Sequence, residues 1–254
     1  MKHRVLLAVT VLVSGWTNLL AQGAAGQRGG QAPQTARAAA PIDLTGYWVS
    51  IVTEDWRFRM VTPPKGDFAS IPTNPAGVQV GQQWDPAKDE AAGEQCKSYG
   101  APAIMRVPGR IHITWDNDTT LKIETDAGQQ TRLFHFGEFQ PPSGAATWQG
   151  NSVASWEVAG GGRGRGGTPA GGSLKVVTTG IRAGYLRKNG YPYSDKTTVT
   201  EYYDRTNETN GDSWVVVTTI VNDPVYLAQE FITSTHFKKQ ADAAGWNPQP
   251  CTAR

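Results

Sequence analysis

The sequence has few of the side chains from which metal centres and covalent active sites are built. Its 254 residues include only two Cys and four His, and it contains no HExxH segment and no Cys/His cluster at metal-ligand spacing. It also lacks GxSxG, a P-loop, and a GxGxxG segment between a strand and a helix. These absences argue against a metal enzyme, a nucleotide-binding protein and a covalent hydrolase. We therefore expect no metal and no cofactor.

The chain also lacks a hydrophobic run that is long enough to cross a membrane as a helix. Its apolar segment 5–13 follows three charged or ionisable residues at positions 2–4, and a small residue, Ala21, comes soon after it. This order is typical of a secretory signal peptide over residues 1–21, and the run is far shorter than the roughly 20 residues of a membrane span. No Cys follows the cleavage point to carry a lipid. We therefore predict a periplasmic or secreted protein that does not span a membrane.

The expected mature chain lacks an excess of either charge. Of the 24 Lys and Arg, two lie in residues 1–21, which leaves 22 against 22 Asp and Glu. Segments 22–41 and 159–172 contain Arg but no acid, so the rest of the chain is mildly acidic. A protein of this kind lacks the excess of positive charge that nucleic-acid binding requires. We therefore expect no nucleic-acid partner.

Two segments have little hydrophobic content. Residues 22–41 are mainly Gly, Ala, Gln and Pro, which cannot bury enough surface to offset the entropy of ordering, so we predict a disordered linker. Residues 159–172 interrupt a strand-rich region with a similar composition. We interpret them as a loop insertion, and an RNA-binding arginine–glycine tract is the alternative. Residues 42–254 are expected to form a single domain.

In the remaining chain, many segments alternate between apolar and polar residues. These segments are rich in Val, Ile, Thr and aromatic residues, and this pattern predicts β-strands. The nine predicted strands cover residues 46–53, 110–115, 120–125, 130–136, 152–158, 174–178, 197–204, 214–221 and 231–238. A helix is predicted over 86–99 with Asp85 as its N-cap, and a shorter helix starts at Asn74 and Pro75. Hairpins in sequence without βαβ alternation predict an all-β fold with one or two short helices, either an antiparallel barrel or a β-sandwich.

Several segments resemble known families. Residues 43–48 (DLTGYW) resemble the Gly-x-Trp first strand of lipocalin-like (calycin) barrels, in which the Trp plugs one end. Three other runs resemble a family of uncharacterised exported bacterial β-rich proteins over roughly residues 40–240: WQGNSVASWE (148–157), NGYPYSD (189–195) and NDPVY (222–226). The resemblance implies an antiparallel lipocalin-like barrel and no settled activity. A His often stands in that family at the positions of Asn151 and Tyr193, so the resemblance assigns no metal or general-base role there.

Cys96 and Cys251 are the only cysteines of the chain. In an oxidising compartment they allow a single intramolecular pairing, which ties the middle of the chain to its C-terminal end. We predict this disulfide, and two buried thiols are the alternative.

Strands 120–125 and 130–136 are predicted to form a hairpin. Residues 126–128 (Asp-Ala-Gly) suit a three-residue loop with the Gly in the left-handed conformation. This loop would place Ile123 near Thr131.

Each face of this hairpin would mix polar and apolar side chains. Glu124 and Arg132 would share one face with Phe134, whereas His135 would lie on the other. In a closed barrel one face points inward, so that either an ion pair or a histidine would face an aromatic-lined cavity. The alternative is an ordinary cross-strand ion pair on a solvated face.

Two further segments carry candidate site residues. Glu201 and Tyr203 lie on the more apolar face of strand 197–204, where Glu201 is either a general base or anchor in a pocket or the structural partner of an Arg. Residues 56–60 are predicted to continue the first strand, with Trp56 on one side and Arg59 on the other. The alternative for that segment is an ordinary strand, with one face packed in the core and the other exposed to water.

Nine Trp, eight Tyr and seven Phe predict that an interior cavity would be lined with rings, which suit flat apolar molecules; the alternative is that the rings only fill the core. The first hypothesis is a protein that binds a small apolar or aromatic molecule. The expected ligand-binding residues are Trp56, Arg59, Arg132, Phe134 and Tyr193. The second is a cofactor-independent lyase, isomerase or hydratase, and the third an envelope domain that binds another protein. The acid–base residues of the second would be Glu124, His135, Glu201 and Tyr203.

Overall fold

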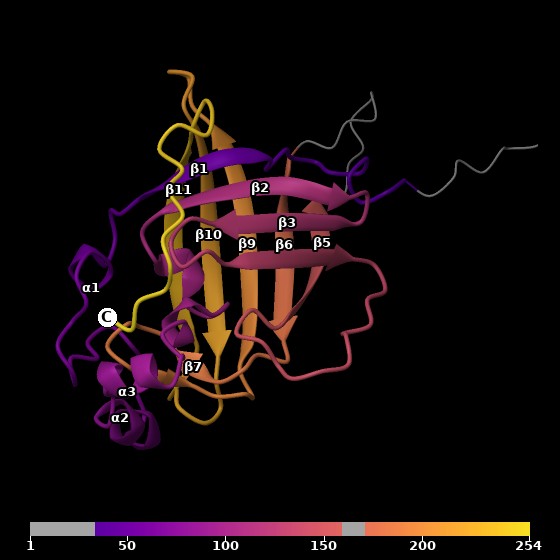
Figure 1. The fold of residues 1–254 in the computed structure, drawn as a ribbon. Helices are drawn as coiled ribbons and strands as arrows, with labels where there is room; N and C mark the ends of the chain where they lie inside the picture. Colours follow the sequence, from indigo (N-terminus) through magenta and orange to yellow (C-terminus); the bar gives the residue numbers. More distant parts are fainter. Residues whose placement is uncertain (1–33, 159–170) are drawn as a thin grey trace, which may run out of the picture. The chain divides into compact units, whose positions relative to one another are not determined.

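The computed structural model describes residues 34–158 and 171–254, and in this part of the chain nine strands close into a β-barrel (Figure 1). The barrel confirms the predicted all-β fold in its barrel form. The strands follow one another around it in the order β1 (Gly46–Ile51), β11 (Phe231–Lys239), β10 (Ser213–Asn222), β9 (Thr198–Asn207), β6 (Gly172–Thr179), β5 (Asn151–Val158), β4 (Thr131–Phe136), β3 (Thr120–Thr125) and β2 (Arg110–Asn117). The predicted signal peptide and most of the loop insertion 159–172 lie outside the described residues.

All neighbouring strands of the barrel are antiparallel except β4 and β5, which pair in parallel. A parallel pair requires the chain to return to the end at which the first strand began, and residues 137–150 make this return. The predicted hairpin topology therefore holds everywhere except at this crossover.

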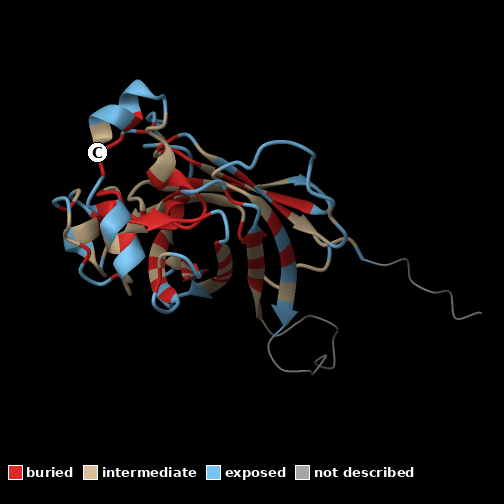
Figure 2. Cartoon of the chain, turned by 90° about the horizontal axis from the view of Figure 1, so that it is seen from below, coloured by how far each residue is buried: buried red, intermediate tan, exposed pale blue. Residues whose placement is uncertain are grey.

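The side chains of the barrel strands alternate between its interior and its outer face. Figure 2 shows this alternation as red and paler bands along the strands, and β10 has the burial pattern that a half-buried strand requires. Trp48 of β1 is fully buried in the core, and its Nε1 donates a hydrogen bond of 2.9 Å to the carbonyl oxygen of Leu44. Burial of one such large apolar side chain contributes on the order of 1.5–3 kcal/mol.

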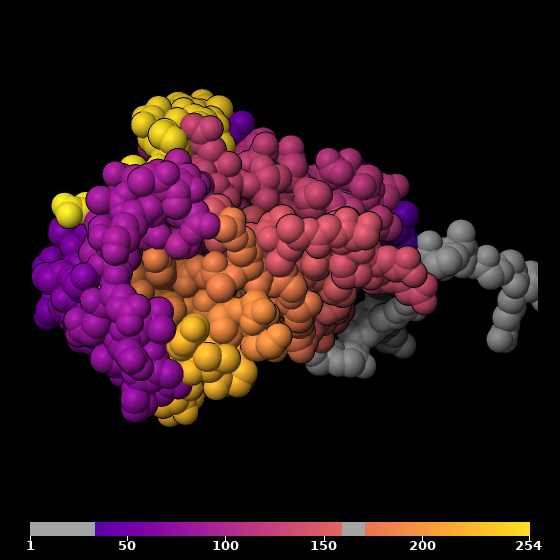
Figure 3. Space-filling view, turned by 60° about the horizontal axis from the view of Figure 1, so that its bottom comes forward, coloured from indigo at the N-terminus to yellow at the C-terminus, as the bar shows by residue number. Residues whose placement is uncertain are grey.

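Three long connections leave the barrel at the same end, which we call the loop end. They comprise residues 52–109, 180–197 and 223–230. They carry α1 (Trp56–Arg59), α2 (Pro75–Gly81), α3 (Pro86–Ala91), the 3₁₀ turns η1 (Lys97–Tyr99) and η2 (Ile104–Arg106), and the short strands β7 (Gly184–Tyr185) and β8 (Pro192–Tyr193). Figure 3 shows the purple segment with α2 and α3 beside the orange segment that includes β7 and β8.

Side-chain hydrogen bonds join these connections to one another. The Tyr191 hydroxyl donates to the carbonyl oxygen of Tyr226 at 2.6 Å and accepts from the backbone N–H of Asn74 at 3.3 Å. The Asn74 Nδ2 also donates to the carbonyl oxygen of Val225 at 2.9 Å. Residues from three distant parts of the sequence therefore form one packed layer over the loop end.

Helices α2 and α3 begin where the sequence predicts. The Asn74 Oδ1 accepts from the N–H of Gly77 at 2.8 Å, and the Asp85 Oδ1 accepts from the N–H of Ala87 at 3.2 Å. The predicted helix 86–99 is too long, because α3 ends at Ala91 and Gly93 follows with a φ of 69°. A left-handed residue ends a helix, so the chain turns there before it reaches η1.

The N-cap of α3 is open to a simple test. The Asp85→Ala change is expected to lower the free energy of unfolding by about 1 kcal/mol, because the N–H groups of Ala87 and Lys88 lose their acceptor. Urea unfolding followed by circular dichroism measures this loss. The matched control is Asp195→Ala, since Asp195 is exposed and caps no helix. An equal effect of both changes would contradict the role of Asp85.

The prediction that residues 56–60 extend the first strand is wrong. Strand β1 ends at Ile51, and Asp55 adopts a left-handed conformation with a φ of 49° directly before α1. This turn reverses the expected arrangement, since Trp56 is 66% exposed whereas Arg59 is buried. Arg59 can be buried because its guanidinium is paired with Glu54.

Residues 34–41, the last part of the predicted linker, contact the barrel. The carbonyl oxygen of Ala36 accepts from Trp156 Nε1 at 2.8 Å, and the N–H of Arg37 donates to the carbonyl oxygen of Asp118 at 3.1 Å. The linker prediction considered how little surface the side chains of this segment can bury. The contacts seen here are instead made by its backbone groups. The rest of the predicted linker lies outside the described residues.

Candidate functional site

A cavity of about 340 Å³ lies at the loop end. Its walls come mainly from four segments that are far apart in the sequence: 58–62, 98–108, 186–188 and 249–252. The volume falls in the range of small-molecule pockets. The layer of connections over the barrel end therefore contains a partly open cavity with enough space for a small ligand.

The charged side chains that line this cavity have one sign. Arg59 comes from α1, Arg106 from η2, and Arg187 and Lys188 from the segment that follows β7. No Asp or Glu of the described residues is part of the lining. The cavity therefore presents a positive surface to whatever it holds.

Arg59 is fully engaged by the protein. Its Nε donates to the carbonyl oxygen of Arg106 at 2.9 Å, and its guanidinium is paired with Glu54. Burial lowers the pKa of Arg59, and the charge of Arg106 lowers it as well, while Glu54 opposes the change. Arg59 acts mainly as a brace that fixes α1 against η2.

Arg106 is buried and only partly satisfied. Its Nη2 donates to Asp55 Oδ2 at 2.9 Å, and its guanidinium carbon lies 5.4 Å from the ring centre of Phe231. Its Nη1 is buried and has no hydrogen-bond partner among the residues that the structure describes. A buried donor without an acceptor is costly, and a guanidinium cannot escape this cost by losing its proton.

Arg187 is held only by neutral acceptors in the described chain. Its Nη2 donates to the carbonyl oxygen of Ala69 at 2.9 Å and to Ser70 Oγ at 3.0 Å, and no described carboxylate lies within ion-pair distance. Burial and the nearby charge of Arg106 lower the pKa of Arg187 to about 10. The two guanidinium groups therefore repel each other in a place that is shielded from water.

The rest of the cavity wall is largely apolar. It includes Phe58, Val61, Val107 and Leu186. The Arg187 guanidinium carbon lies 4.4 Å from the centre of the Phe58 ring, which holds that guanidinium in place. The cavity thus combines an apolar wall with a cationic group, an arrangement that suits an amphipathic molecule.

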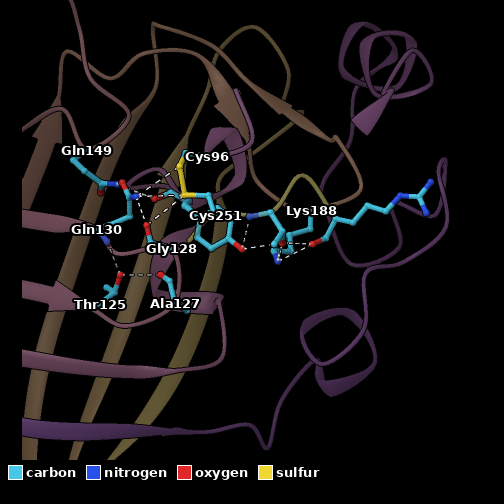
Figure 4. The surroundings of a disulfide bond; sticks show 11 residues. Cys96, Thr125, Ala127, Gly128, Gln130, Gln149, Lys188 and Cys251 are labelled. Atoms are coloured by element: carbon cyan, nitrogen blue, oxygen red, sulfur yellow. Dashed lines mark hydrogen bonds between the residues drawn. A yellow bond between two sulfur atoms is a disulfide. The ribbon is translucent and has the colours of Figure 1, made fainter. Parts of the chain in front are cut away.

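A disulfide joins Cys96 to Cys251, as Figure 4 shows, and confirms the predicted pairing. The Cα atoms of the two residues are 5.1 Å apart, although 155 residues separate them in the sequence. The segment around Cys251 supplies Gln249, Pro250 and Thr252 to the lining. The disulfide therefore attaches one wall of the cavity to the segment that follows α3.

The C-terminal wall also has hydrogen bonds to the barrel. The N–H of Gly128 donates to the carbonyl oxygen of Gln249 at 2.9 Å, and the N–H of Gln249 donates to the carbonyl oxygen of Asp126 at 2.8 Å. Lys188 Nζ donates to Thr252 Oγ1 at 3.1 Å and lies 4.9 Å from the ring centre of Tyr99. Figure 4 shows Gly128, Cys251 and Lys188 along this wall.

A second buried group of polar residues lies inside the barrel. Arg132 donates from Nη1 to Glu201 Oε1 at 2.8 Å and from Nη2 to Glu201 Oε2 at 2.6 Å, and both side chains are fully buried. The Tyr203 hydroxyl donates to Glu201 Oε1 at 3.2 Å, and Arg132 lies 4.9 Å from the ring centre of Phe134. Burial and the Glu201 charge raise the pKa of Tyr203 well above its usual value.

This interior group does not belong to the cavity. None of Arg132, Phe134, Glu201 and Tyr203 lines the cavity at the loop end. Burial lowers the pKa of Arg132, but the attraction of Glu201 raises it above its usual value. Of the two interpretations of Glu201, the geometry favours the structural partner of an arginine.

The predicted register of the hairpin β3–β4 is wrong by one residue. Ile123 pairs with Arg132 and not with Thr131. The loop has one residue more than expected, since Gln129 also takes a left-handed φ, of 50°, and the N–H of Thr125 donates to the carbonyl oxygen of Gln130. A slip of one residue exchanges the two faces of a strand, and it places Arg132 inside the barrel and Glu124 outside.

Glu124 and His135 both lie on the outer face. Glu124 Oε2 is 3.4 Å from His112 Nδ1 and 3.2 Å from Lys122 Nζ. The His135 ring stacks on Phe139 with ring centres 3.9 Å apart, and partial burial lowers the pKa of His135. The structure therefore separates these two predicted acid–base residues from Glu201 and Tyr203.

The predicted ligand-binding residues are also dispersed. Arg59 lines the cavity, whereas the exposed Trp56 does not. Tyr193 is buried in the layer over the loop end, and its hydroxyl has no partner among the described residues. Arg106 and Arg187 were not among the residues predicted from the sequence, because no motif marks either of them. The only signal for Arg106 is its position directly after the apolar run 101–105.

The described residues contain no group of three or more His, Cys, Asp or Glu side chains that could hold a metal ion. In the same residues, no helix is both long and apolar enough to cross a membrane. Comparison with known proteins gave no match: no family model, no curated protein and no solved structure matches the chain.

Proposed function

We propose that the protein binds a small, largely apolar molecule in the cavity at the loop end. The observation that carries this proposal is a partly open cavity of about 340 Å³ whose wall combines Phe58, Val61, Val107 and Leu186 with a few polar groups. Small-molecule sites have this composition. The aromatic side chains inside the barrel fill its core, so the proposed site lies at the end of the barrel.

The alternative function, a lyase, isomerase or hydratase without a cofactor, has less support. Such an enzyme needs an acid and a base that reach the same bound substrate. Glu201 and Tyr203 are near each other but fully buried, and neither lines the cavity. The third hypothesis, a protein-interaction domain, rests on two small groups of exposed apolar residues: Trp56, Met60 and Val61 in and after α1, and Leu133 and Val153 on the neighbouring strands β4 and β5.

We also propose that the protein works outside the cytoplasm. The disulfide between Cys96 and Cys251 supports this location, because such bonds persist in oxidising compartments. The closed barrel and the buried Trp48 support the resemblance to lipocalin-like barrels.

Filling the cavity tests the proposed function. N-phenyl-1-naphthylamine, a neutral aromatic probe whose fluorescence rises in apolar surroundings, is expected to bind one per chain. The Thr62→Phe change places a ring at a half-buried position of the lining and is expected to weaken binding at least tenfold, which corresponds to about 1.4 kcal/mol. The measurement is a fluorescence titration together with the melting temperature of each variant.

Thr131→Phe is the matched control for this experiment. Thr131 is exposed on β4, where an aromatic residue is well tolerated, and it does not line the cavity. We expect this variant to bind the probe like the unchanged protein. Failure of the unchanged protein to bind the probe, or equal binding by both Phe variants, would refute the proposed site.

A further inference from the structure

We propose that the ligand of this cavity is an organic acid, whose carboxylate is recognised by Arg106 and Arg187 while its apolar body contacts the apolar residues of the lining. This inference rests on the proposed function and names the chemical class of the ligand. It follows from the charges of the lining, from the hydrogen bonds of each guanidinium, and from the distribution of apolar side chains.

The first step concerns charge. Four basic side chains line the cavity, and the two carboxylates that bind them directly, Glu54 and Asp55, pair with Arg59 and Arg106. Arg187 has no such partner in the described residues; the charge of Arg106 repels it, while Asp55 and Asp67 attract it from beyond ion-pair distance. An anion in the cavity would relieve the remaining repulsion between the two buried guanidinium groups.

The second step concerns hydrogen bonds. The buried Nη1 of Arg106 lacks an acceptor in the described structure, while the Nη2 of the same group is fixed by Asp55. The guanidinium is therefore held in one orientation with one donor unused. A carboxylate oxygen is the acceptor that such a donor binds most strongly.

The third step distinguishes an organic acid from a bare anion. Phe58, Val61, Val107 and Leu186 form an apolar wall that an inorganic ion would leave without contacts. An apolar body removes this wall from water, and the carboxylate then satisfies the cationic side. The volume of about 340 Å³ suits a molecule the size of one or two fused rings.

The test compares two ligands that differ only in charge. 2-Naphthoate carries a carboxylate, whereas 2-naphthamide has the same rings and no charge. Both are titrated against the unchanged protein by calorimetry and by displacement of N-phenyl-1-naphthylamine. We expect 2-naphthoate to bind at least 30-fold more tightly than 2-naphthamide, and inorganic phosphate to displace neither the probe nor the naphthoate at the same concentrations.

Three variants locate the source of this preference. Arg106→Gln and Arg187→Gln each remove one charge from the lining and are expected to reduce the preference for naphthoate at least tenfold while the neutral probe still binds. Arg57→Gln is the matched control, since Arg57 belongs to the same α1 segment as Arg59 but is 66% exposed and does not line the cavity. It should keep the full preference. Two lining variants are used so that the test still works if one of them misfolds. Binding of the neutral probe shows directly whether each variant is folded.

The outcomes separate the two proposals. If neither the neutral probe nor either naphthalene ligand binds, the proposed function fails. If the neutral probe binds but 2-naphthoate and 2-naphthamide bind equally, or if both lining variants keep the preference, the organic-acid inference fails and the cavity remains a site for neutral molecules. Displacement of naphthoate by phosphate at matched concentration would also overturn it, since the site would then recognise any anion.

Discussion

The Glu201→Gln change is expected to lower the free energy of unfolding by about 3–5 kcal/mol, because it leaves the Arg132 guanidinium buried without a counter-charge. Both side chains are fully buried and bound through two hydrogen bonds of 2.8 and 2.6 Å. Arg132 cannot lose its proton, and its Nε already lacks a partner among the described residues. Urea unfolding at neutral pH, followed by tryptophan fluorescence, measures the loss.

A double variant distinguishes two quantities: the free-energy cost of leaving one buried charge without its partner, and the net contribution of the intact ion pair to stability. Arg132→Met together with Glu201→Leu removes both charges and keeps most of the volume, and we expect it to recover most of the lost stability. Glu157→Gln is the matched control, since Glu157 forms an exposed cross-strand pair with Lys175 at 3.3 Å. It should leave the stability unchanged within error. A Glu201→Gln protein as stable as the control would contradict this account of the interior.

The interior pair also shows where prediction from sequence reaches its limit. All nine barrel strands were predictable, because alternation of residues such as Val215 and Val217 with polar neighbours is a local property. The position of Arg132 was not, because it depends on whether one more residue, Gln129, takes a left-handed conformation in the preceding loop. Gln129 is not a glycine, so the sequence gives no sign that it takes a left-handed conformation. Its place in the turn nevertheless decides which face of β4 points inward.

Prediction of the candidate site was limited for a different reason. The cavity lies between connections that no local pattern brings together, and Arg106 and Arg187 are 81 positions apart in the sequence. Sequence did predict the disulfide and the N-caps Asn74 and Asp85, which fix parts of this layer. Of the charged residues that line the cavity, only Arg59 was predicted from the sequence. It was placed in a β-strand, whereas in the structure it lies in α1.

The disulfide is expected to have the second large effect. Replacement of Cys96 and Cys251 by Ala should lower the free energy of unfolding by about 4–5 kcal/mol in the chain-entropy model, since the bond closes a loop of 155 residues. It should also weaken binding of N-phenyl-1-naphthylamine, because Gln249, Pro250 and Thr252 then line the cavity on a segment held mainly by the hydrogen bonds to Asp126 and Gly128. Urea unfolding and probe titration measure the two effects.

A core variant separates release of the wall from general loss of stability. Ile113→Ala removes buried volume from the barrel and is expected to cost about 2–5 kcal/mol, a loss similar to that of the disulfide, while Cys251 stays attached to Cys96. Its probe affinity should equal that of the unchanged protein at temperatures where both are folded. If the Ile113→Ala variant and the disulfide-free protein lost affinity equally, the disulfide would stabilise the fold without shaping the site. A loss confined to the disulfide-free protein would mean that the covalent bond maintains the cavity wall itself.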